Sequence, residues 1–247
     1  MANPHQFYLI HMNKKTGYRA TWDPGRPLII GQIGKLDKSG VFTVYSSLEK
    51  EGIPIEILTD TSASEMDYTS HDQVNISIKA KGATPVTGSV LTKADAGFTI
   101  GFKSERAVVF QAKGFKTHQI TNLKEIEKQV SEKYKNGNWE KHWLIITTLV
   151  ETSAATIIIS NSKNVMLDLK AQANVGTAKL KLTDASLGLS VAREQGSTLK
   201  FLAEAGLTPL YTLSGIRHPL FGKPTMVKKL AQTESFKKQP FKMEEVK

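Results

Sequence analysis

Cysteine is absent from this chain of 247 residues. Its absence excludes disulfides, thiolate metal sites, cysteine nucleophiles and S-acylation, and it suits a reducing compartment. Long apolar runs are missing as well. The most apolar segment, residues 143–162, is interrupted by Glu151 and is rich in Thr and Ser, so it falls short of the roughly 20 apolar residues that a membrane-spanning helix requires. Any membrane role would therefore need β-strands or binding at the membrane surface.

Motifs of export, catalysis and cofactor binding are also missing. Residues 1–10 lack the basic start and apolar block of an export signal, so we expect a cytoplasmic protein. No G-x-G-x-x-G, Walker, G-x-S-x-G or EF-hand spacing occurs. Six histidines are scattered without the spacing of metal ligands: His5, His11, His71, His118, His142 and His218. We therefore predict a protein that is not an enzyme and that has no catalytic residues, cofactor or metal site.

Positive charge is the main compositional bias. The chain has 33 Lys plus Arg against 23 Asp plus Glu, a net charge of +10, which favours anionic partners such as nucleic acid, acidic lipid headgroups or an acidic protein. Half of the excess lies in residues 217–247. Nucleic-acid binding would need stacking aromatics among the basic residues, and Phe98, Phe102, Phe110 and Phe115 come closest. Core phenylalanines beside a solvated basic face explain them more simply, so we do not expect a nucleic-acid partner.

Strand-like alternation is unusually long in residues 143–201. Apolar residues occupy every second position in 167–175, and after Gly176 the phase flips to Ala178, Leu180 and Leu182. A further apolar run follows at Leu187, Leu189 and Val191. Such alternation is typical of membrane-spanning β-strands of roughly 10 residues. A soluble antiparallel sheet with one buried face gives the same pattern, and alternation alone favours that second interpretation.

A second alternating block begins at Val74 and continues through Ile76 and Ile78. A segment of small residues, 82–97, separates it from Phe98, Ile100 and Phe102. This middle segment fits neither a strand nor a helix well, so it is either an irregular or helical piece that lies on a sheet or a flexible surface loop between two hairpin arms.

The remaining pattern predicts an α+β fold with a twisted, mostly antiparallel central sheet and peripheral helices. The clearest helix follows Thr121 or Asn122, with Leu123, Ile126 and Val130 on one face. Residues 59–72 are polar and predict an exposed loop. Strands are predicted at residues 7–10, 28–33, 41–45, 74–80, 107–112, 144–150, 156–160, 198–202 and 210–213.

The order of these elements resembles the bacterial gasdermins over most of the chain. The residues that carry the likeness are Asn136-Gly137-Asn138, 143–148, 167–176 and 178–182, together with Gly17-Tyr18 and 47–50. The resemblance implies a fold like the gasdermin amino-terminal domain, held inactive by a short carboxy-terminal segment that a partner protease removes. The freed domain would oligomerise on anionic lipid of the inner membrane, and two regions would refold into hairpins of a large pore. Cell death in anti-phage defence would follow.

On this template the domain is 1–218, and 219–247 is an autoinhibitory or flexible basic tail. The hairpins come from about 74–110 and 154–191, and 167–175 has enough helix propensity to be helical before insertion. The predicted membrane-inserting residues are Ile76, Ile78, Phe98, Ile100, Phe102, Leu167, Leu169, Leu180, Leu182, Leu187 and Leu189. Residues predicted to meet lipid headgroups or line the wet face are Lys79, Lys81, Lys103, Lys163, Lys179 and Lys181. An ordinary solvated strand face explains these lysines equally well.

The tail is predicted to dock through Phe221, Met226, Val227, Leu230 and Phe236, with Lys228 and Lys229 as candidate cleavage positions. A disordered basic tail is the alternative. One departure from the family matters: many members carry a lipidated amino-terminal cysteine, which this chain lacks. Two other functions stay open. The chain could be a basic binding module for nucleic acid or anionic lipid, or a structural assembly subunit.

Overall fold

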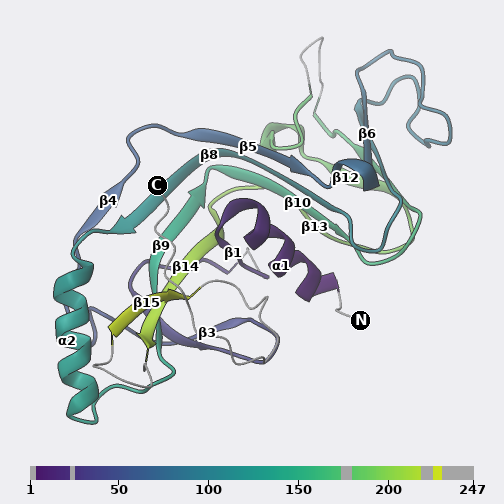
Figure 1. The fold of residues 1–247 in the computed structure, drawn as a ribbon. Helices are drawn as coiled ribbons and strands as arrows, with labels where there is room; N and C mark the ends of the chain where they lie inside the picture. Colours follow the sequence, from purple (N-terminus) through teal and green to yellow (C-terminus); the bar gives the residue numbers. More distant parts are fainter. Residues whose placement is uncertain (1–3, 23–25, 174–179, 218–224, 230–247) are drawn as a thin grey trace.

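A long, twisted antiparallel sheet forms the body of the molecule (Figure 1). The computed structural model describes residues 4–22, 26–173, 180–217 and 225–229. The central strands of this large sheet are, in spatial order, β1 (Arg19–Ala20), β14 (Leu207–Arg217), β9 (Leu144–Thr152), β8 (Val108–Ile120), β10 (Ala154–Ser160) and β13 (Thr198–Glu204). Strands that flank this path are β2 (Gln32–Leu36), β3 (Phe42–Ser47), β4 (Ile57–Thr59), β5 (Ser64–Thr69) and β15 (Thr225–Lys229).

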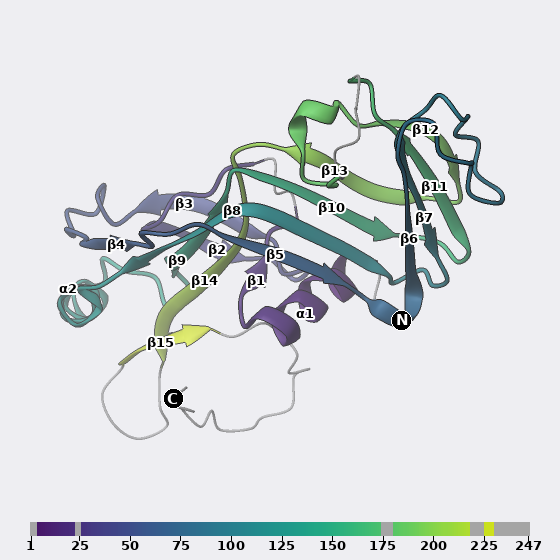
Figure 2. The ribbon, with the colours of Figure 1, turned by 90° about the horizontal axis from the view of Figure 1, so that it is seen from above.

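A smaller sheet stands at one end of the large one (Figure 2). Its strands are, in order, β12 (Ser190–Gln195), β11 (Val165–Lys170), β7 (Gly97–Phe102) and β6 (Val74–Lys79). The strand pairs described in both sheets are antiparallel. The described residues also include two α-helices, α1 (Pro4–Thr16) and α2 (Leu123–Lys135), and two short 3-10 turns, His71–Gln73 and Ala185–Leu187. The predicted α+β class is confirmed.

Two cores lie on opposite faces of the large sheet where it is formed by β8 and β10. One core lies between the two sheets and includes Phe98, Ile100, Leu167, Val109 and Ile158. The other lies under α1, where Tyr8, Leu9 and Met12 pack on β8 and β10. Strands β8 and β10 are therefore buried on both faces, which explains why 156–160 has no polar alternation.

Helix α1 corrects the prediction of a strand at residues 7–10. Its buried residues, Tyr8, Leu9 and Met12, share one side of a helix. The helix ends at Gly17, whose φ of +74° suits the position after a helix and whose N–H donates to the Asn13 carbonyl at 2.8 Å. The four consecutive residues 7–10 look strand-like only when they are read without the neighbouring helical turns, which place Met12 on the same side as Tyr8 and Leu9.

Three further predictions are wrong. Residues 59–72 are not one exposed loop, because β5 occupies Ser64–Thr69 and packs Met66 and Tyr68 against the core under α1. Residues 167–170 lie in β11 and are not helical. Residues 180–182 form no strand; Leu180 and Leu182 are buried in irregular structure.

Other predictions are confirmed in place, with changed boundaries. Helix α2 has the predicted buried face of Ile126 and Val130. Asn122 precedes it without a side-chain cap, since its Oδ1 accepts from the Glu56 N–H at 2.9 Å. The strand expected at 28–33 is β2, shifted toward the carboxyl end.

Candidate functional site

Four strands of the large sheet continue into the small sheet in the same spatial order. The order β5, β8, β10, β13 in the large sheet becomes β6, β7, β11, β12 in the small one. Each strand crosses through a short break, at residues 70–73, 103–107, 161–164 and 196–197. The small sheet is therefore the folded-over end of one four-stranded sheet (Figure 2).

One face of the small sheet is apolar. Ile76 pairs with Ile100, and Ile100 pairs with Leu167, so the three side chains form a row across the strands. The apolar face comprises Val74, Ile76, Ile78, Phe98, Ile100, Phe102, Val165, Leu167 and Leu169. Most of these side chains are buried in the core between the sheets, whereas Ile78, on the edge strand, is 58% exposed. Every predicted membrane-inserting residue on these strands therefore lies on this one face.

Residues 180–189, which we call the clasp, cover part of the same face. Leu180, Leu182 and Leu187 are buried in the core between the sheets, and Leu189 packs against it. The clasp is held by the Lys181 ammonium, 3.2 Å from Glu65, and by a hydrogen bond from the Thr156 hydroxyl to the Leu182 carbonyl. The predicted inserting residues of this segment thus serve, in this state, to cover the apolar face.

The opposite face of the small sheet is polar and carries Asn75, Ser77, Lys79, Thr99, Asp168 and Lys170. Lys79 corrects the prediction of a solvated or lipid-facing lysine, because it is only 1% exposed. Within the described part of the chain its ammonium has no hydrogen-bond partner. Lys81, Lys103 and Lys163 are exposed, and Lys179 lies outside the described residues. A role of these lysines at lipid headgroups or on the wet face stays a prediction.

Residues 80–96, which we call the strap, join β6 to β7 without helix or strand. Of the two interpretations of this segment, an irregular piece lying on a sheet is confirmed, since Leu91 is 2% exposed and Ser89 and Val90 hydrogen-bond to Asp168 on β11. At the end of the strap, Lys170 donates to Asp95 at 2.8 Å. This hydrogen bond, with two from Thr92, lowers the pKa of Asp95 to about 2.

Charged residues in and beside the strap occur only at every second position, a pattern that the sequence alone did not make us notice. In residues 74–102 the charged residues Lys79, Lys81, Lys93 and Asp95 are all odd-numbered, and the even positions carry no charge. The register of β6 and β7 pairs even with even, Val74 with Phe102 and Ile78 with Phe98. Continued along the strap, it would pair Ala80 with Ala96 and centre a turn on Gly88, whose φ is already +83°.

The second hairpin shows the same property. The register that pairs Lys170 with Ser190 would continue to Ala171 with Leu189 and Ala173 with Leu187. Odd positions from 165 to 191 are uncharged except Lys179 and Lys181, which would lie at the tip. Because Ile100 pairs with Leu167, the even positions of the first hairpin and the odd positions of the second share a face.

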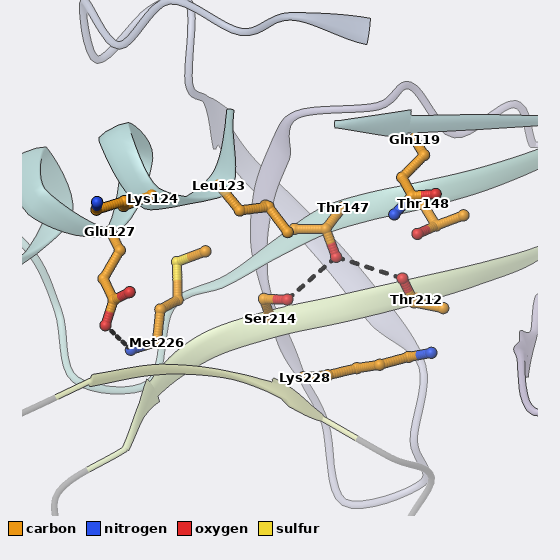
Figure 3. Close-up of a pocket in the computed structure, with 10 residues that line it drawn as sticks. All are labelled: Gln119, Leu123, Lys124, Glu127, Thr147, Thr148, Thr212, Ser214, Met226 and Lys228. Carbon is orange, nitrogen blue, oxygen red and sulfur yellow. Dashed lines mark hydrogen bonds between the residues drawn. The ribbon is translucent and has the colours of Figure 1, made fainter. Parts of the chain in front are cut away.

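Strand β15 lies in the predicted tail and pairs with β14 along Leu213–Arg217 (Figure 3). Met226 packs into the core beside α2, and its N–H donates to Glu127 Oε1 at 3.0 Å. A polar cavity of about 330 Å³ lies beside it, with Lys228 from β15 and Thr147, Thr212 and Ser214 from the sheet among its lining residues.

Of the other residues predicted for the tail, Val227 is half-buried and Lys228 is exposed, while Phe221, Leu230 and Phe236 lie outside the described residues. Lys229 pairs with Leu213 through its backbone.

Within the described residues, no helix has the length and apolar character needed to cross a membrane. No protein-family model matches the chain, and no curated protein matches it. Among solved structures it is similar to a bacterial gasdermin from Bradyrhizobium tropiciagri, with 14% identity, 89% of each chain covered and a TM-score of 0.38. At this distance the likeness carries no argument about function.

Proposed function

We propose that this protein forms pores by inserting two lengthened β-hairpins into a membrane. The observation that carries the proposal is the uncharged apolar face of the small sheet, which continues by strand alternation through the strap and into the second hairpin. Residues 74–86 would form an arm of thirteen residues, longer than the roughly 9–11 residues that a tilted membrane strand needs.

The folded-over sheet supplies the starting state for this change. Most of the apolar face that would meet lipid is buried against the large sheet and the clasp, so the intact protein keeps most of it from water. Both hairpins already lie side by side through the pairing of β7 with β11. Lengthening therefore extends an existing four-stranded register. Edge strands β6 and β12 would pair with neighbouring copies, because unpaired strand edges are unfavourable in lipid.

The activation step is proposed from the tail. Residues 1–218 form the pore-forming domain and 219–247 the inhibitory tail, in which β15 covers the edge of β14. A protease cutting between β14 and β15, or at Lys228 or Lys229, releases this cover. The intact protein is cytoplasmic, and the cut form oligomerises at anionic lipid of the inner membrane. The resemblance drawn from the sequence adds the setting, cell death in anti-phage defence.

The test is dye release from anionic liposomes by the intact chain and by a form cut at an engineered site within residues 218–224. Leakage is expected only after cutting. Absence of leakage from every stable cut form would sink the proposal, and salt-sensitive DNA binding by the intact chain would then favour the basic binding module.

A charge scan of the strap tests the inserted face. Thr84 and Ala94 are exposed and even-numbered, and Ala83 and Thr87 are exposed and odd-numbered. We expect Thr84→Lys and Ala94→Lys to reduce leakage, because a lysine on the lipid face is unfavourable, by about 2–4 kcal/mol at the bilayer centre and by less toward the turn. Ala83→Lys and Thr87→Lys are the matched controls and should retain leakage. Equal effects at even and odd positions would contradict insertion of this hairpin.

A further inference from the structure

Asp168 occupies the middle of the polar face of the small sheet and is fully buried. Its Oδ1 accepts hydrogen bonds from the hydroxyl of Thr99 at 2.7 Å and from that of Ser89 at 3.2 Å. Its Oδ2 accepts from the N–H of Val90 at 3.0 Å. A buried carboxylate needs such donors in place of water, and hydrogen bonds to a charged group are stronger than neutral ones.

These bonds connect the two hairpins. Asp168 belongs to the second hairpin, through β11, whereas Ser89 and Val90 belong to the strap of the first. Two further contacts join the same parts: the Lys170 ammonium bonds to Asp95, and the Ala171 N–H donates to the Ala96 carbonyl at 2.9 Å. The strap of one hairpin is therefore fastened to the face of the other.

Only part of this arrangement is compatible with a lengthened first hairpin. Thr99 lies opposite Asp168 in the register of β7 and β11, so their bond would persist. Ser89 would move to the turn at the far end of the arm, ten residues beyond Thr99, which is about 33 Å along an extended strand. The bonds from Ser89 and Val90 to Asp168 cannot survive that movement.

We infer that Asp168 is a catch that couples release of the two hairpins: it holds the strap folded, and the first hairpin lengthens only after the strap leaves the second. The inference rests on the proposed function and names the regulation of the same site.

A disulfide tests the catch directly, because the natural chain has no cysteine. The variant Ser89→Cys/Asp168→Cys places thiols where the two side chains now hydrogen-bond. We expect the cut, oxidised variant to lose leakage and to regain it after reduction. The single variants Ser89→Cys and Asp168→Cys are the controls, and reductant should not change their leakage.

A second variant keeps the inference testable if the disulfide does not form. Ser89→Ala removes a hydroxyl that donates to Asp168 and accepts from the Leu91 N–H at 3.1 Å. It should speed leakage of the cut form by about tenfold, the change that loss of one charge-assisted bond produces. An unchanged rate, or full leakage by the double variant in which the disulfide has formed, would overturn the catch while cut wild-type protein still leaks. Failure of cut wild-type protein to leak would instead overturn the proposed function.

Discussion

The hydroxyl of Thr156 donates a hydrogen bond to the carbonyl oxygen of Leu182, so a buried side chain of β10 holds the clasp in place. The same hydroxyl accepts from the Ala203 N–H at 2.7 Å. We expect Thr156→Val to lower the free energy of unfolding by about 2–4 kcal/mol, because both backbone groups lose their partner in a buried place. Thermal unfolding should show a drop of roughly 5–10 °C.

Thr156→Ser is the control, since it keeps the hydroxyl and removes one methyl group. It should retain most of the stability that the valine variant loses. A serine variant as unstable as the valine variant would assign the effect to packing.

The turn between β13 and β14 allows a test of backbone conformation. Gly206, in this turn, has a φ of +68° with open space where a Cβ would lie, and Ala203, near the end of β13, has a φ of +52°. We expect Gly206→Ala to lower stability by about 1 kcal/mol, the cost of this region for a residue with a side chain. Ala203→Gly should raise stability slightly or leave it unchanged, because relief of the same cost offsets the greater freedom of glycine in the unfolded chain. Urea unfolding measures both.

Stability should fall in mild acid because of two histidines on α1. Burial, followed by the charges of Lys15 and Lys14, lowers the pKa of His11 below 6.5, and burial lowers that of His5 against the opposing charge of Asp37. A histidine with a lowered folded-state pKa stabilises fully above its unfolded value and loses that contribution as the pH falls below it. Urea unfolding at about pH 7.5 and pH 5.5 should therefore show lower stability in acid.

His11→Gln should make this pH dependence smaller. Tyr68→Phe removes the hydrogen bond between Tyr68 and His11 and keeps the titrating group, so it should lower stability at both pH values and preserve the difference. The same pH dependence in His11→Gln as in the wild type would show that His11 is not responsible.

The tail strand should loosen when its bond to α2 is removed. Glu127→Ala deletes the acceptor of the Met226 N–H. We expect trypsin to cut at Lys228 or Lys229 about fivefold faster, because cleavage of a paired strand follows its local opening. Glu125→Ala, at an exposed position of the same helix, should leave the rate unchanged. Equal rates for both variants would show that Glu127 does not hold β15.

The sequence predicts elements well where local signals agree. Helix α2 has an amphipathic face and a glycine after its end, and it is found in place. Helix α1 and β5 are missed because tertiary packing decides them: Tyr8, Tyr68 and Met66 meet in one core although they are distant along the chain. Burial of Lys79 and the role of Asp168 give no local signal either, since the strap donors of Asp168 lie at Ser89 and Val90. The restriction of charged residues to odd positions in 74–102 is visible in the sequence, but only the observed register shows which positions share a face.

The breaks between the two sheets also involve the amino-terminal helix. On β7 the even residues Phe98 and Phe102 face the core between the sheets, whereas on β8 the even residues Val108 and Phe110 face the core under α1. The inward side thus changes parity across 103–107, and β10 and β11 show the same reversal. If each pair of strands became one straight ribbon, the lipid-facing side would run directly into the surface on which α1 sits. Under the proposed function, helix α1 would then obstruct this straightening, and it would have to move aside before the pore could open fully.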